Sequence, residues 1–154
     1  MTLLETIRLI EAVAADQPAV NMIVRNDIFR LNAAPDARYG VFGWTQGIHR
    51  TAIDSPFFDF AFTFFYIDRL TEDLGNQVEV QSVGIDTLNN IIRDLETKGV
   101  EISDWSYQTF NQRFTDECAG AFANVTLRVP VFSSCAEHFL GDFNDDYNGD
   151  FYVY

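Results

Sequence analysis

The clearest pattern in the chain is an aromatic alternation in the segment FFDFAFTFFYIDR, residues 57–69. Successive side chains of an extended strand point to opposite faces of a sheet. The even positions form an aromatic face: Phe58, Phe60, Phe62, Phe64 and Tyr66. The odd positions are mixed: Phe57, Asp59, Ala61, Thr63, Phe65 and Ile67. The pattern predicts a strand whose even face lies in the core and whose odd face is only partly covered.

Two segments carry apolar residues at helical spacing. In the first, Thr2 and Glu5 match a capping box and Pro18 closes the segment. Its apolar stripe is Leu3, Leu4, Ile7, Ile10, Val13 and Ala14. The second helix is predicted over 76–99, with Asn76 and Glu79 at its start and Gly99 at its C-cap. Its stripe is Val80, Val83, Leu88, Ile91, Ile92 and Leu95. A helix is favoured here although Gly84 costs it about 1 kcal/mol and QVEV, 77–80, also suits a strand.

Further strands are predicted over 20–32, 38–50, 105–114 and 121–131. Short connections between most of the strands favour antiparallel pairing. The order of elements predicts an α+β fold with two layers, in which two helices pack on one face of an antiparallel sheet of about four to five strands. Phe60, Phe62 and Phe64 are then expected beneath the second helix.

Gly40, Gly43 and Gly47 are dense for a strand, and glycine weakens a strand unless a bend or a close approach is needed. They predict a long, bent hairpin arm that contacts a neighbouring subunit through Trp44 and Ile48. Phe57 and Phe65, on the partly covered odd face of 57–69, are further candidates for a subunit interface.

The segment 136–154 differs from the preceding domain, residues 1–135. It interleaves five acidic residues with Phe139, Phe143, Tyr147, Phe151, Tyr152 and Tyr154. This composition predicts an extended assembly arm that docks its aromatic rings on another surface. Phe143, Tyr147, Phe151 and Tyr154 are its interface candidates. Asn144, Asp146, Asn148 and Gly149 match part of a calcium loop, but flanking helices are not predicted, which favours a solvated acidic turn.

The balance of charge narrows the possible partners. There are 23 Asp and Glu residues against 10 Lys and Arg, a formal net charge of −13. This charge disfavours nucleic-acid binding but suits a surface that DNA must slide past. The excess of aromatic residues, 15 Phe among them, fits either a Phe-rich core or a core shared between subunits.

Continuous apolar stretches of membrane length are missing, and the start of the chain lacks a signal-peptide pattern, so synthesis in the cytoplasm is expected.

No motif for catalysis, cofactor binding or metal binding stands out. Cys118 and Cys135 lack zinc-ligand spacing and are interpreted as buried thiols, and His49 and His138 are too few for a His-rich site. Asp59 is interpreted as a carboxylate satisfied by water or by a neighbouring subunit. The sequence therefore predicts a protein that is not an enzyme and that needs no cofactor.

The segments MIVRNDIFRLN, RYGVFGWTQGIHR, FTFFYIDRL, VEVQSVGIDTLNNIIRDLE and YQTFNQRFTDECAGAFANVTLRVPV resemble small virion proteins of phages and prophages that infect Bacteroides-type bacteria. In size and element order, residues 1–135 are also similar to the tail-terminator, or tail-completion, proteins of tailed phages.

This resemblance implies a structural virion protein, made in the host cytoplasm, that forms a ring, usually a hexamer, at the head–tail junction. Such a ring caps the tail tube, joins it to the head connector on the portal side and lets DNA pass without holding it. Two other classes stay open. One is another neck component, such as a head-completion or portal-docking ring of twelve subunits. The other is a monomeric acidic module that mimics DNA.

Overall fold

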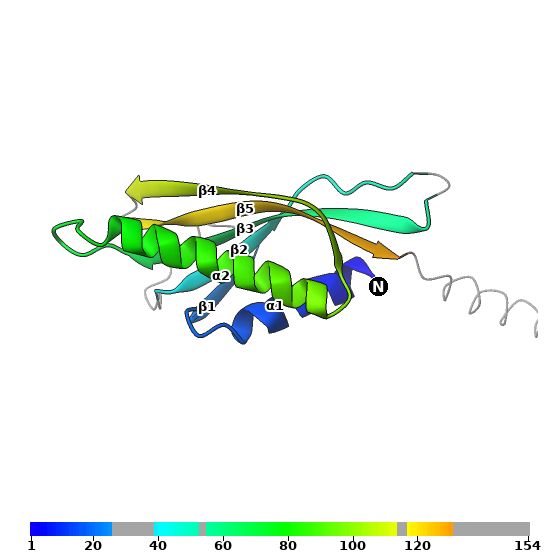
Figure 1. Cartoon of the computed structure of the whole chain (residues 1–154), viewed down its shortest axis with the longest axis horizontal. Coiled ribbons are helices and arrows are strands. Elements are labelled where there is room, and N and C mark those ends of the chain that lie inside the picture. The colour runs from blue at the N-terminus through cyan, green and yellow to red at the C-terminus, as the bar shows by residue number, and fades with distance from the viewer. Residues whose placement is uncertain (26–38, 53–54, 114–116, 131–154) are drawn as a thin grey trace, which may run out of the picture.

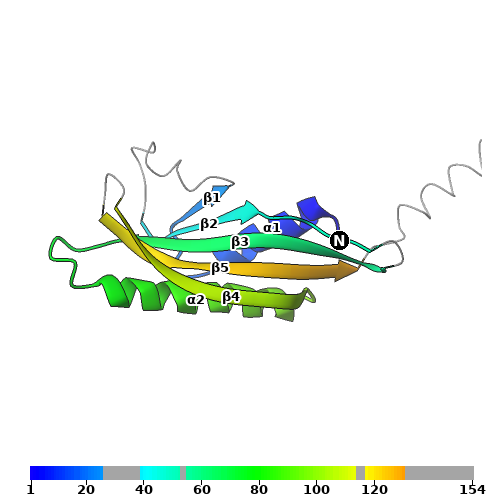
Figure 2. The same ribbon diagram turned by 90° about the horizontal axis from the view of Figure 1, so that it is seen from above.

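The computed structural model describes residues 1–25, 39–52, 55–113 and 117–130. Their elements are α1 (Leu3–Ala15), β1 (Met22–Arg25), β2 (Val41–Gln46), β3 (Phe57–Arg69), α2 (Gln77–Thr97), β4 (Glu101–Arg113) and β5 (Glu117–Pro130). Figure 1 shows both helices on the same side of the sheet, and Figure 2, turned by 90°, shows the long strands β3 and β5 running in nearly the same direction as α2. The predicted α+β architecture, with two helices packed on a five-stranded sheet, is confirmed.

The strand order in the sheet is β1-β2-β3-β5-β4. The pairs β2–β3, β3–β5 and β4–β5 are antiparallel, as predicted, but β1 and β2 are parallel. A parallel pair needs a connection of about a dozen residues or more, and residues 26–40 supply it. The sheet is therefore mixed rather than wholly antiparallel.

The strand bounds also differ from the prediction. β2 is shorter than the predicted 38–50, while β4 and β5 each begin four residues before their predicted starts. Parts of the predicted strands lie outside the described residues: residues 26–32 of the first, Arg38 of the second, Phe114 of the fourth and Val131 of the last.

Helix α1 begins with the predicted capping box. The backbone N–H of Glu5 donates to the Thr2 hydroxyl at 3.2 Å, and the Thr2 N–H donates to the Glu5 carboxylate at 2.7 Å. Ile10, Val13 and Ala14 are buried, but Leu4 is 56% exposed and does not belong to the core stripe. The side-chain amide of Gln17, just after the helix, donates to Asp94 Oδ2 at 2.8 Å and so joins the end of α1 to α2.

Strand β3 places its even face under the helices, as predicted. Phe60, Phe62 and Phe64 are buried in one cluster with Leu88, Ile91, Leu95 and other residues of both layers. The Phe64 ring meets the Phe42 ring edge-on, with centroids 5.6 Å apart. Aromatic pairs in this geometry add to the stabilisation from buried area, so this layer is the main core of the domain.

Helix α2 lies unusually close to the sheet at Gly84. A Cβ atom at this position would be 3.2 Å from both the Cβ and the backbone N of Ala121, and 3.2 Å from Tyr66 Cδ1. The glycine that weakens the helix in isolation therefore permits its close contact with β3 and β5. Val83 was predicted to belong to the apolar stripe of this helix, but it is 39% exposed, so that part of the prediction is wrong.

The start of α2 is not capped as predicted. Asn76 makes no side-chain hydrogen bond to the first turn of the helix. Its side-chain oxygen instead accepts from the Thr71 backbone N–H at 2.9 Å, and its amide donates to the Arg69 carbonyl at 3.4 Å. Asn76 therefore stabilises the connection between β3 and α2. Gly99, with φ of 86°, adopts the left-handed conformation expected just after a helix.

The face of the sheet away from the helices has its own apolar cluster at one end. Val24, Val41, Phe65, Ile67 and Cys118 are buried in it. The odd face of β3 is thus more fully covered at Phe65 and Ile67 than the sequence pattern predicted, and the expectation that Cys118 is buried is confirmed.

Candidate assembly surface

The connection between β2 and β3 lies at the end of the sheet where β5 ends and where the chain begins (Figures 1 and 2). It stays attached to β3 beyond the end of β2. The Gly47 N–H donates to the Ala61 carbonyl at 2.8 Å, and Arg50 and Asp59 exchange two backbone hydrogen bonds of 2.9 Å. We call the side chains of Ile48, Phe57, Asp59 and Arg128 at this end the hairpin-end surface.

Two apolar side chains of this surface are exposed. Ile48 is 77% exposed and Phe57 is 37% exposed. The guanidinium carbon of Arg128 lies 6.0 Å from the centre of the Phe57 ring, at the outer limit of a cation–π contact. Ile48 and Phe57 were both predicted interface residues, and both are accessible to a partner in the part of the chain that the structure describes.

An ion-pair cluster crosses three strands beside Phe57. Asp59 on β3 and Glu101 on β4 are both register partners of Arg128 on β5. Arg128 Nε donates to Asp59 Oδ1 at 2.8 Å and Nη2 donates to Oδ2 at 3.2 Å, while Nη1 lies 3.6 Å from Glu101 Oε1. The hydrogen bond from Arg128 lowers the pKa of Asp59 below its ordinary value. The partner of Asp59 is therefore an arginine of its own chain. The prediction that water or a neighbouring subunit would satisfy this carboxylate is wrong.

Trp44 is not an exposed anchor, contrary to the prediction. Its side chain is 3% exposed and packs in the main core, with its ring centroid 6.1 Å from that of Phe62. The indole N–H donates to Glu11 Oε1 at 3.2 Å, and the other carboxylate oxygen of Glu11 accepts from Arg25 at 2.6 Å. The prediction failed because β2 pairs with β3 along its length and turns Trp44 toward α1.

Phe65 is also buried within its own chain, at 4% exposure. It lies opposite Gly43 in the β2–β3 register, and a Cβ at Gly43 would be 2.0 Å from the ring. Gly43 thus makes room for Phe65 inside the sheet, and it does not mark an arm that leaves the sheet. Phe65 leaves little surface for a partner.

The other four predicted interface residues, Phe143, Tyr147, Phe151 and Tyr154, lie outside the described residues, as does the partial calcium loop.

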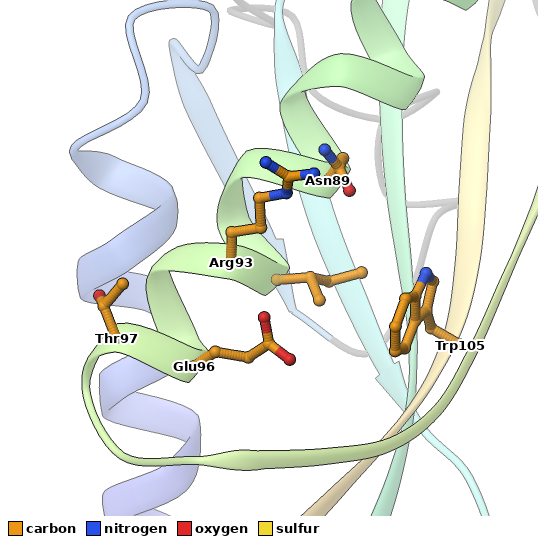
Figure 3. A pocket seen from close by; sticks show the side chains of 6 residues that line it. Asn89, Arg93, Glu96, Thr97 and Trp105 are labelled. Atoms are coloured by element: carbon orange, nitrogen blue, oxygen red, sulfur yellow. The ribbon is translucent and has the colours of Figure 1, made fainter.

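A second surface feature was not predicted. A groove of about 600 Å³ runs between α2 and β4 (Figure 3) and is lined by Asn89, Ile92, Arg93, Glu96, Thr97 and Trp105. Trp105 is 48% exposed, whereas Tyr107, which has the same parity on β4, is half-buried and its hydroxyl donates to Asn89 at 3.2 Å. The sequence did contain a signal for this groove. Trp105 and Tyr107 are two residues apart on β4, so they lie on the same face of the sheet, which is the face that the helices cover.

Chemically active groups are sparse in the part of the chain that the structure describes. Within it, no set of three or more His, Cys, Asp or Glu residues is placed to hold a metal ion. None of the described helices is long and apolar enough to cross a membrane. The Tyr66 hydroxyl donates to the Ala19 carbonyl at 3.3 Å, and burial, assisted by Asp68, raises the pKa of Tyr66 to about 12. Tyr66 is therefore a neutral structural donor at physiological pH.

No model of a known protein family matches the chain, and no curated protein sequence matches it. The features that bear on its function are therefore the hairpin-end surface, the α2–β4 groove, and the composition and pattern of the chain.

Proposed function

We propose that this protein is a structural component of a phage virion that self-associates into a ring at the head–tail junction, where it terminates the tail tube and lets DNA pass. The observation that carries the proposal is the hairpin-end surface, which presents Ile48 to solvent and, beside the paired Arg128, the partly exposed Phe57. Exposed apolar side chains rimmed by polar groups are typical of protein–protein contacts. The resemblance to tail-terminator proteins supplies the biological setting.

The charge of the chain supports a channel through which DNA slides. Acidic residues outnumber basic ones by 23 to 10, so the chain as a whole repels phosphates. On the sheet face away from the helices, the centre is polar, with the Thr63 hydroxyl donating to Asn124 Oδ1 at 2.9 Å. Such a face would present hydrogen-bonding groups but few cations to passing DNA.

The proposed partners are further copies of the chain, most simply six, together with the tail tube protein and the proteins on the portal side. The main alternative is another neck component with twelve-fold symmetry, which would use the same apolar surface. A monomeric DNA mimic is the second alternative, supported by the acidic composition alone. Neither catalysis nor a cofactor is part of the proposal.

The oligomeric state of purified protein tests the proposal, alone and with the tail tube protein of the same genome. Mass measurement by light scattering and negative-stain images should show rings, and Ile48→Asp should abolish them because it places a charge in the apolar contact. Val78→Asp is the matched control, since Val78 is 74% exposed on α2 and the substitution adds the same charge. Rings of twelve would favour the alternative neck component, whereas a monomer at every concentration, with or without tube protein, would contradict self-association.

A further inference from the structure

Strand β4 leaves one edge of the sheet open among the described residues. It is 13 residues long, from Glu101 to Arg113, and β5 is the strand that pairs with it. A free edge presents a row of backbone N–H and C=O groups, to which an extended segment of another chain can add as a strand. An edge of this length is also a hazard for uncontrolled association unless something covers it.

The α2–β4 groove lies directly beside this edge. Trp105 forms one wall, and the buried Ile92 also lines the groove. On α2 the Arg93 side chain extends toward Asn89, while the Glu96 carboxylate lies on the side that faces Trp105 (Figure 3). The exposed half of the Trp105 indole offers a flat face on which an aromatic side chain can pack. Arg93 adds a cation at the rim. Glu96 adds an anion on the same helix, so the groove suits an extended segment that carries aromatic rings and whose carboxylates lie on the Arg93 side (Figure 3).

We propose that the groove and the free edge of β4 bind the C-terminal arm, residues 136–154, of a neighbouring copy of this chain. The inference rests on the proposed function and names the acceptor site for the arm. The arm carries Phe143, Tyr147 and Phe151 for the aromatic face, and Asp145, Asp146 and Asp150 for Arg93. It thus matches both features of the groove.

The point of departure favours a neighbouring copy, and the length of the segment permits it. The 24 residues 131–154 follow Pro130, which is the register partner of Phe57 on the hairpin-end surface. The arm therefore leaves the domain at the boundary proposed to face the next subunit. At about 3.3 Å per residue, these residues span up to about 80 Å, whereas β4 is about 43 Å long. The arm is long enough to cross the boundary and lie along the neighbour's edge strand.

Photo-crosslinking of the full chain tests this contact. The photo-reactive residue p-benzoylphenylalanine replaces Trp105 in isotopically light protein, which is mixed with an equal amount of heavy protein before irradiation. We expect crosslinks from position 105 to residues 136–154, with about half of them joining light to heavy copies, as a contact between different copies requires. The same photo-reactive residue at Val78, exposed at the other end of α2, is the control and should give little product with the arm.

A separate variant measures the contribution of the ring. Trp105→Ala should weaken self-association by about 30-fold, the effect of losing an aromatic hot spot, while Val78→Ala should not. Circular dichroism checks that both variants fold. Crosslinks within single copies, crosslinks from position 105 to segments other than the arm, or no crosslinks at any concentration would each overturn the inference. If rings form without the arm crosslink, the inference fails while the proposed function stands; if the full chain stays monomeric, both fail.

Discussion

Replacing Gly84 by alanine sets the intrinsic preference of a helix against the packing of this fold. Alanine in a helix interior is favoured over glycine by about 1 kcal/mol, so an isolated α2 would gain stability. In the folded domain, however, the new Cβ would be 3.2 Å from the Ala121 backbone N, which cannot rotate away, and 3.2 Å from Tyr66 Cδ1. Overpacking of a well-packed core costs about 1–3 kcal/mol. We therefore expect Gly84→Ala to leave stability unchanged or to lower it by up to about 2 kcal/mol.

Urea denaturation followed by circular dichroism measures this effect as a shift in midpoint. Asn90→Ala is the matched control, because Asn90 is exposed on the same helix and its replacement changes helix propensity without adding atoms to the core. Gly84→Ala combined with Ala121→Gly removes one of the two facing methyl groups and should be less destabilising than the sum of the single changes. If Gly84→Ala alone raised the midpoint at least as much as Asn90→Ala, α2 would not lie this close to β5.

Three further predictions concern the core, the ion pair and the arm. Phe62→Ala should cost about 3–5 kcal/mol of unfolding free energy, whereas Thr63→Ala, on the opposite face, should cost about 0.5–1.5 kcal/mol for one hydrogen bond; equal losses in chemical denaturation would contradict the assigned faces. Because the pKa of Asp59 is lowered on folding, its ion pair stabilises the domain above the unfolded pKa of about 3.9 and loses this effect as the pH falls through the folded value. The difference in melting temperature between the wild type and Asp59→Asn should therefore be present at neutral pH and vanish in strong acid, and a difference independent of pH would refute this role. Deleting residues 136–154 should change the melting temperature little but impair joining to the tail tube, as measured by co-sedimentation; an unfolded truncation would place the segment in the core.

Local periodicity predicted the elements that pack through one face. The alternation in 57–69 and the stripe of α2 identified the main core because each signal lies within one segment. The pairing of segments was harder to predict, since it depends on residues far apart in the chain. Trp44 looked like an anchor because its partners, Glu11 and Phe62, belong to other elements. The parity of Phe65 likewise indicated its face of the sheet but not what covers that face.

The sequence predicted only part of the candidate surface, because pairing between distant segments also decides which side chains are exposed. Ile48 and Phe57 are exposed at the end of the sheet, as an interface requires, but Asp59 is paired within its chain rather than with a neighbour. Trp105 was missed because its exposure depends on where α2 ends relative to β4, which only the packing of the two layers determines. The exposure of residues at the ends and edges of the sheet is therefore the property that the sequence pattern predicts least well.

The proposed contacts also indicate how such a ring would assemble. Burying a side chain such as Ile48 or Phe57 contributes roughly 1.5–3 kcal/mol, and ordering each residue of an arm costs about 1–2 kcal/mol of backbone entropy. Copies that each carry a formal charge of −13 also repel one another. A single contact between two copies is therefore weak. In a closed ring every copy gives an arm and receives one, so the last subunit gains two contacts for a single loss of translational freedom. Assembly should accordingly be cooperative and should be favoured where a tail tube already holds several copies in place.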